Sequence, residues 1–240
     1  MDKIRCLRLI SENYNRIYLT DKGTILKCFY HRDFYTTEKE TYLLLREHGF
    51  PFSAKLLSFD DTKLCIELEY YPHDLNYYRD VRFYLELLSY FDDIPLKNLN
   101  NFNVDRNLLT IAERLKMKLG NDIFPMLEEI CGSTVSVPKR FLHGDFRLEN
   151  ILHQGDQIKI IDFEGSCIGD RNVDYTYLFF SFIVRGRGFR IIKFFSREKY
   201  FNINNFKYYF CFLLLRLLEN PRVKDKQQIF SLLKEVIKLK

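Results

Sequence analysis

FLHGDFRLEN, residues 141–150, gathers polar side chains of several kinds directly after the apolar pair Phe141-Leu142. These side chains are His143, Asp145, Arg147, Glu149 and Asn150. A loop of this composition either holds a ligand or is an ordinary polar turn. The residues that follow it favour the first interpretation.

A β-hairpin is expected directly after Asn150, where the apolar runs ILH and IKIIDFE flank the turn Gln154-Gly155-Asp156-Gln157. Because a hairpin returns the chain to its starting edge, Asn150 and Asp162 should lie side by side, with Asp145 at the same edge. Converging amide and carboxylate oxygens are the ligands that a hard cation requires when it bridges phosphate oxygens. The sequence therefore predicts that Asn150 and Asp162 bind magnesium beside a nucleotide.

Phosphoryl transfer asks a protein mainly for positioning and for neutralisation of charge. Asp145 fits the carboxylate that orients an attacking hydroxyl and accepts its proton. Lys27 is alone in the apolar strand TILKCFY, where an ammonium without a partner would be costly to bury. A strand lysine paired with a helix glutamate is the arrangement that holds the α and β phosphates in kinases.

The segments before and after residue 71 differ in their periodicity. Short β-rich runs surround one helical stretch from about Asp33 to His48, and helical spacing dominates after Tyr71-Pro72. The sequence therefore predicts an α+β chain of two lobes. Residues 1–71 form a small antiparallel sheet of five strands with one helix, the nucleotide-binding lobe. Residues 72–240 form a larger, mainly helical lobe for catalysis and acceptor binding.

Composition excludes several classes of protein. The chain has 240 residues, of which 47% are hydrophobic and 29% charged, so disorder is not expected. No apolar stretch approaches the roughly 20 residues that span a bilayer, and the N-terminal residues lack the features of a signal peptide. We expect a cytoplasmic protein. Six cysteines without a CxxC pair predict reduced thiols and no zinc site.

Positive charge is concentrated in residues 185–199, which hold six basic residues against Glu198. Spacings of three, three and four from Arg187 to Arg197 predict a short basic amphipathic helix. Such a helix is consistent with a solvated face, with an anionic acceptor, or with peripheral contact with an anionic membrane surface. A nucleic-acid partner is not expected, because no recognised binding module accompanies the charge.

Taken together, these motifs resemble the aminoglycoside phosphotransferase and choline kinase family of protein-kinase-like small-molecule kinases. HGDFRLENIL is similar to the family's HGD-x-R-x-x-N loop, and IDFEGSCIGDRNVDY to its aspartate-aromatic-glutamate segment with a trailing Gly-Asp-Pro-x-x-Asp. The likeness covers about residues 5–180. It implies a bilobal protein-kinase-like fold and a kinase that uses ATP and Mg²⁺. GTP is the alternative nucleotide, because the hinge would read the base through backbone groups.

The resemblance assigns roles by position. It implies Asp145 as the catalytic base, with Arg147 either near phosphate or paired with a carboxylate. Asn150 and Asp162 become the magnesium ligands, and Lys27 with Glu38 the pair that holds the phosphates. His143 and Asp174 would brace the catalytic loop. The hinge residues Glu69, Tyr70 and Tyr71 would contact the base, and Ser11 and Asn15 would belong to the loop that covers the nucleotide.

Two glutamates compete as the partner of Lys27. Thr37 and Glu40 have the spacing of a capping box, which would commit Glu40 to the helix start and leave Glu38 free. The same capping would place Glu38 in the first turn, earlier than the family usually has it. We favour Glu38, with Glu40 as the alternative.

Three residues or segments depart from the family's pattern. The covering loop, residues 11–15, has no glycine, which puts close backbone approach to phosphates there in doubt. Arg171 replaces the usual proline, and His73 stands where a glycine often follows the hinge.

Rival interpretations of the sequence differ in how well they fit. The triplet His31-Arg32-Asp33 spells the protein-kinase catalytic motif, but it lies before the first helix and lacks an asparagine five residues on. A protein kinase is disfavoured because only twelve positions separate Asp162 from Asp174, too few for a peptide-binding activation segment. A non-catalytic nucleotide-binding pseudokinase would need a hidden defect. The acceptor stays open between cationic compounds such as aminoglycosides and choline, an amino-acid alcohol, and a surface-polysaccharide or lipopolysaccharide sugar, which the basic segment favours.

Overall fold

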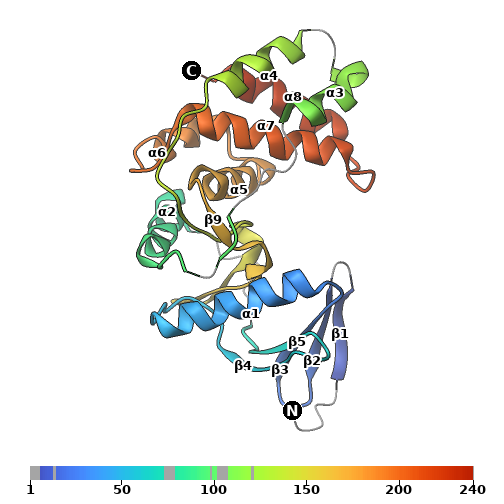
Figure 1. Cartoon of the computed structure of the whole chain (residues 1–240), viewed down its shortest axis with the longest axis vertical. Coiled ribbons are helices and arrows are strands. Elements are labelled where there is room, and N and C mark those ends of the chain that lie inside the picture. The colour runs from blue at the N-terminus through green and yellow to red at the C-terminus, as the bar shows by residue number, and fades with distance from the viewer. Residues whose placement is uncertain are drawn as a thin grey trace. The chain divides into compact units, whose positions relative to one another are not determined.

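The computed structural model describes residues 6–12, 15–72, 79–97, 99–101, 108–119 and 122–239. The chain divides into two compact units (Figure 1). Unit 1 comprises Met1–Asn100 and Phe141–Ile168, and unit 2 comprises Asn101–Arg140 and Gly169–Lys240. This division differs from the expected boundary after residue 71, because the later hairpin is hydrogen-bonded to Phe52 and Ala54. The assignment of nucleotide binding to 1–71 and of acceptor binding to 72–240 stays a prediction.

An antiparallel sheet of five strands, in the order β1-β2-β3-β5-β4, forms the first part of unit 1. Its strands coincide with the short β-rich runs of the sequence. Gly23, at a φ of +70°, makes the turn between the second and third strands. The predicted five strands with one helix after the third are therefore confirmed. The strands are β1 (Cys6–Glu12), β2 (Asn15–Thr20), β3 (Thr24–Phe29), β4 (Leu56–Asp60) and β5 (Cys65–Glu69).

Helix α1 (Arg32–Glu47) follows β3, and its buried face includes Tyr35, Glu38, Thr41, Tyr42 and Leu45. These residues recur at intervals of three and four, as an amphipathic helix requires. The helix begins at His31, which makes no side-chain capping bond. The capping box predicted at Thr37 is wrong, because that residue lies in the second turn of the helix.

The rest of unit 1 builds the region between the sheet and residue 168. Helix α2 (Val81–Ser89) is capped by Asp80, whose side chain accepts from the Arg82 amide. The predicted hairpin is present as β7 (Ile151–Gln154) and β8 (Gln157–Ile160), and the short strands β6 (Arg140–Leu142) and β9 (Cys167–Gly169) pair with each other. Aromatic rings fill the interior: Phe91 stacks on Phe50 with centroids 4.8 Å apart.

Cys28 and Cys65 form a disulfide across β3 and β5. The expectation that every cysteine is reduced is therefore wrong for this pair. The two residues are 37 positions apart in sequence, and only the strand register brings them face to face. The remaining four, Cys6, Cys131, Cys167 and Cys211, are free thiols.

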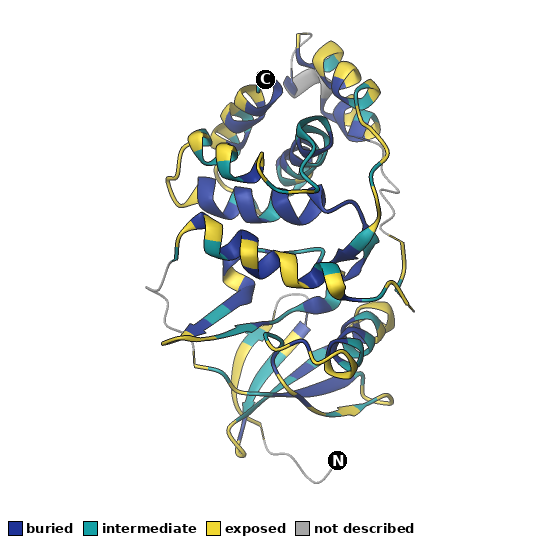
Figure 2. Ribbon diagram, turned by 90° about the vertical axis from the view of Figure 1, so that its left-hand side faces the viewer, coloured by how far each residue is buried: buried dark blue, intermediate teal, exposed yellow. Residues whose placement is uncertain are grey.

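Unit 2 consists mainly of helices. Helix α5 is buried over most of its length, and α7 buries one face (Figure 2). Phe179 is at the centre of an aromatic core, with its ring 5.2 Å from Phe206 and 5.4 Å from Phe210. Asn202 caps α7 and Asp225 caps α8. The helices are α3 (Leu108–Leu119), α4 (Ile123–Gly132), α5 (Asn172–Val184), α6 (Ile192–Phe195), α7 (Ile203–Glu219) and α8 (Lys226–Ile237).

The basic amphipathic helix predicted between Arg187 and Arg197 is wrong. The segment instead forms a 3₁₀ turn over Phe189–Ile191 and the four-residue helix α6. Gly186 adopts a φ of +81°, which ends α5 in a conformation that favours glycine. Packing of aromatic side chains determines the conformation of the remainder of the segment, because the Phe195 side chain is fully buried.

None of the helices in the described ranges combines the length and apolar character that a bilayer crossing requires.

Candidate active site

Lys27 is at the centre of the candidate site, on β3 within unit 1. Its ammonium nitrogen lies 2.5 Å from Glu38 Oε2 on α1 and 2.5 Å from Asp162 Oδ1 after the hairpin. The same atom lies 3.1 Å from Glu164 Oε2. Only 6% of the Lys27 side chain is exposed. The buried ammonium therefore has three carboxylate partners, whereas Glu40 lies aside with 44% of its side chain exposed.

The pKa values of this cluster reflect its burial and its charges. Burial lowers the pKa of Lys27, but the charges of Glu38, Asp162 and Glu164 outweigh burial and raise it. Burial raises the pKa of Glu38 to about 8, against the attraction of Lys27. Burial also raises the pKa of Asp162. The charge and the hydrogen bond of Lys27 outweigh burial, so the pKa of Asp162 is lowered.

The cluster carries an excess of negative charge when its carboxylates are ionised. One ammonium opposes three carboxylates, which leaves two negative charges in a largely buried place. Glu38 Oε1 is buried and accepts no hydrogen bond from the described residues. Two excess charges and spare carboxylate oxygens fit a divalent cation.

Asp145 is held by its own loop through one carboxylate oxygen. Oδ2 accepts from Arg147 Nη2 at 2.5 Å and from Asn150 Nδ2 at 3.1 Å. Oδ1 takes no bond from any residue that the structure describes, and 23% of the side chain is exposed. One oxygen is therefore fixed, and the other is available to a hydroxyl. Arg147 thus pairs with a carboxylate, and its role toward a phosphate stays a prediction.

Asn150 and Asp162 lie at the two ends of the β7–β8 hairpin, as the sequence predicted. The Ile161 amide donates to the Asn150 carbonyl at 3.0 Å, which ties the hairpin exit to its entrance. Asn150 Nδ2 donates to the Asp145 carbonyl at 2.9 Å, so its Oδ1 is left without a hydrogen bond to a described residue. Asp162 adopts a left-handed backbone with a φ of 69° and a ψ of 57°. Such strain in a non-glycine residue is typical of functional sites.

His143 joins the loop to the hairpin from a fully buried position. Its Nε2 lies 3.0 Å from the Ile161 carbonyl, and its Nδ1 lies 3.3 Å from the Asp145 amide. These contacts are consistent with a neutral ring that donates from Nε2 and accepts at Nδ1. The histidine therefore has a bracing position.

A pocket of about 320 Å³ opens beside Lys27. One face of the sheet supplies aliphatic side chains to it, because Ile17 lies opposite Lys27 and Ile25 opposite Leu68. An apolar slot that ends at a cation and carboxylates suits a planar base joined to a charged group. The lining residues are Ile10, Ile17, Ile25, Lys27, Glu38, Ala54, Leu68, Glu69, Tyr70, Tyr71, Asn150, Leu152, Ile161 and Asp162.

The residues expected to contact a nucleotide divide into two groups. Glu69, Tyr70 and Tyr71 line the pocket, whereas Ser11 and Asn15 do not. Asn15 instead donates from Nδ2 to Glu164 Oε2 at 2.5 Å, and its buried Oδ1 forms no hydrogen bond with a described residue. Asn13 and Tyr14 of the same loop, like His73, lie outside the described residues.

Sequence reasoning missed Glu164 and the aliphatic lining of the pocket. Glu164 follows Asp162 by two positions, and its signal was its place in the aspartate-aromatic-glutamate segment. The aliphatic residues could have been found from strand alternation, which places every second residue of β3 on the face of Lys27.

Two other motifs from the sequence make contacts of their own. Asp174 is fully buried on α5 and pairs at 3.3 Å with the buried Arg171, within unit 2. His31, Arg32 and Asp33 are exposed where α1 begins. The look-alike triplet is therefore a helix start.

Comparison with known proteins supports the interpretation of the fold. Residues 82–198 match the model of the phosphotransferase enzyme family. A search of the curated protein sequences finds no match. Among solved structures, an aminoglycoside 2'-phosphotransferase-IIIa in complex with GDP is 16% identical, with a TM-score of 0.68, over 99% of this chain and 93% of that one.

Two further structures have the same fold. A spectinomycin phosphotransferase in complex with ADP and spectinomycin is 12% identical, with a TM-score of 0.68, over 98% of this chain and 91% of that one. Choline kinase LicA from Streptococcus pneumoniae is 14% identical, with a TM-score of 0.65, over 98% of this chain and 92% of that one. These likenesses show that the chain has the fold of these small-molecule kinases, and the family match covers residues 82–198, just under half of the chain.

Proposed function

We propose that this protein is a Mg²⁺-dependent kinase that transfers the γ-phosphate of ATP to a hydroxyl group of a small molecule or a saccharide. The observation that carries the proposal is the arrangement around Lys27. An apolar pocket for a base leads to a buried ammonium for phosphates, and then to oxygens that can hold a divalent cation. ATP is favoured and GTP is the alternative, since solved relatives are described with ADP and with GDP.

Asn150 Oδ1 and Asp162 would hold the magnesium ion, and Glu164 lies within reach of the same place. The ion, when bound, would neutralise charge on the phosphate oxygens. Lys27 would bind the α and β phosphates, and Glu38 would keep its ammonium in position.

Asp145 would carry out the proton transfer. The acceptor hydroxyl would donate to Oδ1, the oxygen that no described residue occupies. As the acceptor oxygen bonds to the γ-phosphorus, the bond from that phosphorus to the bridging oxygen breaks. The hydroxyl proton passes to Asp145, and the nucleoside diphosphate leaves with the electron pair. Arg147 and Asn150 would keep the carboxylate oriented.

Arg147 also bears on the class of acceptor. Its guanidinium offsets the charge of Asp145, which weakens the attraction of that carboxylate for an ammonium group next to the reacting hydroxyl. We therefore favour a neutral or anionic acceptor, such as a sugar of a surface polysaccharide or lipopolysaccharide. A cationic acceptor of the aminoglycoside or choline type is the second candidate. Two solved relatives, a phosphotransferase in complex with kanamycin and a choline kinase, favour it.

Replacement of Asp145 tests the proposal against a non-catalytic nucleotide-binding protein. Asp145→Asn should lower turnover by on the order of 10² to 10⁴ fold. Calorimetry should show that ATP with Mg²⁺ still binds, because Asp145 does not line the pocket. Near-normal turnover of this variant would contradict the role of Asp145. Nucleotide binding without phosphorylation of any acceptor in a broad panel would favour the pseudokinase.

A further inference from the structure

The basic segment of residues 185–199 presents its charges to solvent. All six of its lysine and arginine side chains are exposed. Of these, Arg187, Arg190, Lys193, Arg197 and Lys199 form no ion pair with any residue in the described ranges. Elsewhere in unit 2, Arg114 and Arg171 are paired with carboxylates. These five cations are therefore available to an anionic partner.

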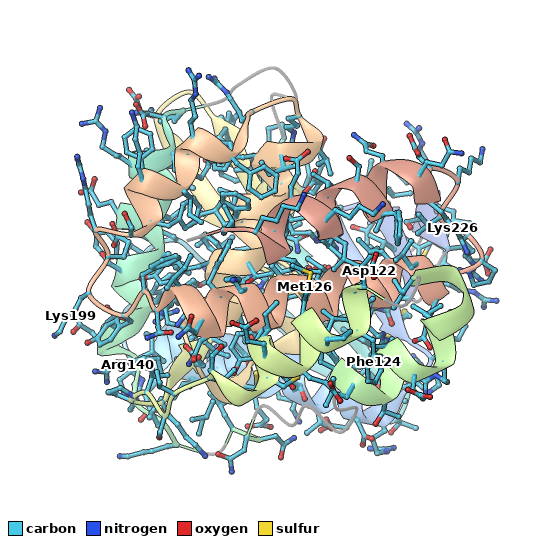
Figure 3. The ribbon with its side chains drawn as sticks, turned by 90° about the horizontal axis from the view of Figure 1, so that it is seen from above. Asp122, Phe124, Met126, Arg140, Lys199 and Lys226 are labelled. Atoms are coloured by element: carbon cyan, nitrogen blue, oxygen red, sulfur yellow. A yellow bond between two sulfur atoms is a disulfide. The ribbon has the colours of Figure 1, made fainter. Side chains whose placement is uncertain are left out.

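The charged surface continues beyond the segment to Arg140. The guanidinium of Arg140 lies 4.4 Å from the centre of the Tyr200 ring, and the Lys199 ammonium lies 5.0 Å from the same ring. Arg140 also donates to the Tyr200 hydroxyl at 2.7 Å. Figure 3 shows Arg140 and Lys199 on the same edge of the helical part. Lys139, beside Arg140, is exposed as well.

Apolar side chains lie between these cations. Val184 is 45% exposed, and Phe189, Ile191, Ile192 and Phe194 are each partly exposed. Phe195 is fully buried and anchors α6 to the core. A soluble polyanion would interact favourably only with the cations. A membrane interface would interact favourably with both the cations and the apolar side chains. The mixture therefore favours a lipid surface over a soluble anion.

We propose that residues 184–199, extended by Lys139 and Arg140, bind peripherally to an anionic membrane surface. The cations would contact anionic head groups, and Phe194 with its apolar neighbours would enter the interface. Each cation near such a surface raises the partition coefficient about fivefold, so three of them together contribute about a hundredfold. This inference does not depend on the proposed kinase activity, since it concerns residues outside the candidate active site.

Co-sedimentation of the full chain with lipid vesicles tests the proposal. At ~0.1 M salt the protein should bind vesicles that contain phosphatidylglycerol, and should not bind vesicles of phosphatidylcholine alone. The triple variant Arg187→Glu, Arg190→Glu, Lys193→Glu should bind at least about a hundredfold more weakly. A matched control reverses three exposed charges elsewhere in unit 2, with Arg222→Glu, Lys224→Glu and Lys238→Glu.

Further variants separate a lipid surface from a soluble polyanion. Phe194→Ala should weaken vesicle binding and leave retention on a heparin column unchanged. The proposal is overturned if the wild-type protein does not bind anionic vesicles, or if both triple variants lose binding equally. It is also overturned if the protein binds heparin but not vesicles. Circular dichroism and nucleotide binding confirm that each variant is folded.

Discussion

The backbone of Gly144 lies directly against that of Gly165. A Cβ atom added to Gly144 would overlap the carbonyl oxygen of Gly165 and would lie 2.6 Å from its carbonyl carbon. Gly144 also has a φ of +80°, which side chains rarely allow. This approach presses the loop that carries Asp145 onto the segment that follows Asp162.

Gly144→Ala should therefore lower the free energy of unfolding by about 2–4 kcal/mol, because the alanine adds both backbone strain and a collision with main-chain atoms. Turnover should fall as Asp145 is displaced. Gly165→Ala is the matched control, since a Cβ there meets nothing closer than 3.5 Å. Denaturant titrations of the two variants check the difference, and equal stabilities would argue against the close approach.

Lys27→Met should weaken both nucleotide binding and folding. The variant removes the only described cation in contact with the buried carboxylate of Glu38, and breaking a buried pair costs about 3–5 kcal/mol. Adding Glu38→Gln should restore part of the stability without restoring nucleotide affinity, because the phosphates still lack their ammonium. Calorimetry and chemical denaturation separate the two effects. Lys63→Met, at a position 72% exposed, is the control that should change neither.

The stability of the nucleotide-free protein should depend on the ionisation of Glu38. Its pKa is raised in the folded state to about 8, from an ordinary value of 4.5. Between these values the folded protein binds more protons than the unfolded chain, so the free energy of unfolding should decrease as the pH rises from about 5 to 8. In Glu38→Gln this decrease should become shallower. Denaturant midpoints without Mg²⁺ check the slope, and parallel curves for the two proteins would refute the assignment.

Arg147→Gln should shift the preference for acceptor charge. Choline, 3,3-dimethylbutan-1-ol and isethionate are hydroxyl compounds of similar size with positive, zero and negative charge. Wild-type kcat/KM should be lowest for choline, and the variant should favour choline by about tenfold more relative to isethionate, because a positive charge is lost beside Asp145. Arg147→Lys should retain the wild-type order. A preference for choline in both proteins would point instead to a cationic acceptor.

The sequence predicted those parts of the site that local pattern determines. A hairpin must bring Asn150 near Asp162, so predicting the hairpin was enough to predict the positions of both residues. The hydrogen bond from Asn15 to Glu164 joins residues 149 positions apart, and no local sequence pattern predicts it. The prediction of a basic helix failed for a different reason. The spacing of its charges was helical, but buried Phe195 and the positive φ of Gly186 determined the backbone.

The pairing of Lys27 with Asp162, 135 positions later, has a consequence for synthesis of the chain. Unit 1 is assembled from two separate pieces, and residues 101–140 must be made between them. While the chain grows, the sheet can form and enclose Lys27, but Glu38 is then its only carboxylate partner. The unit can be completed only after residue 168 has left the ribosome. A nascent chain stopped before that point should be a ready substrate for chaperones and proteases.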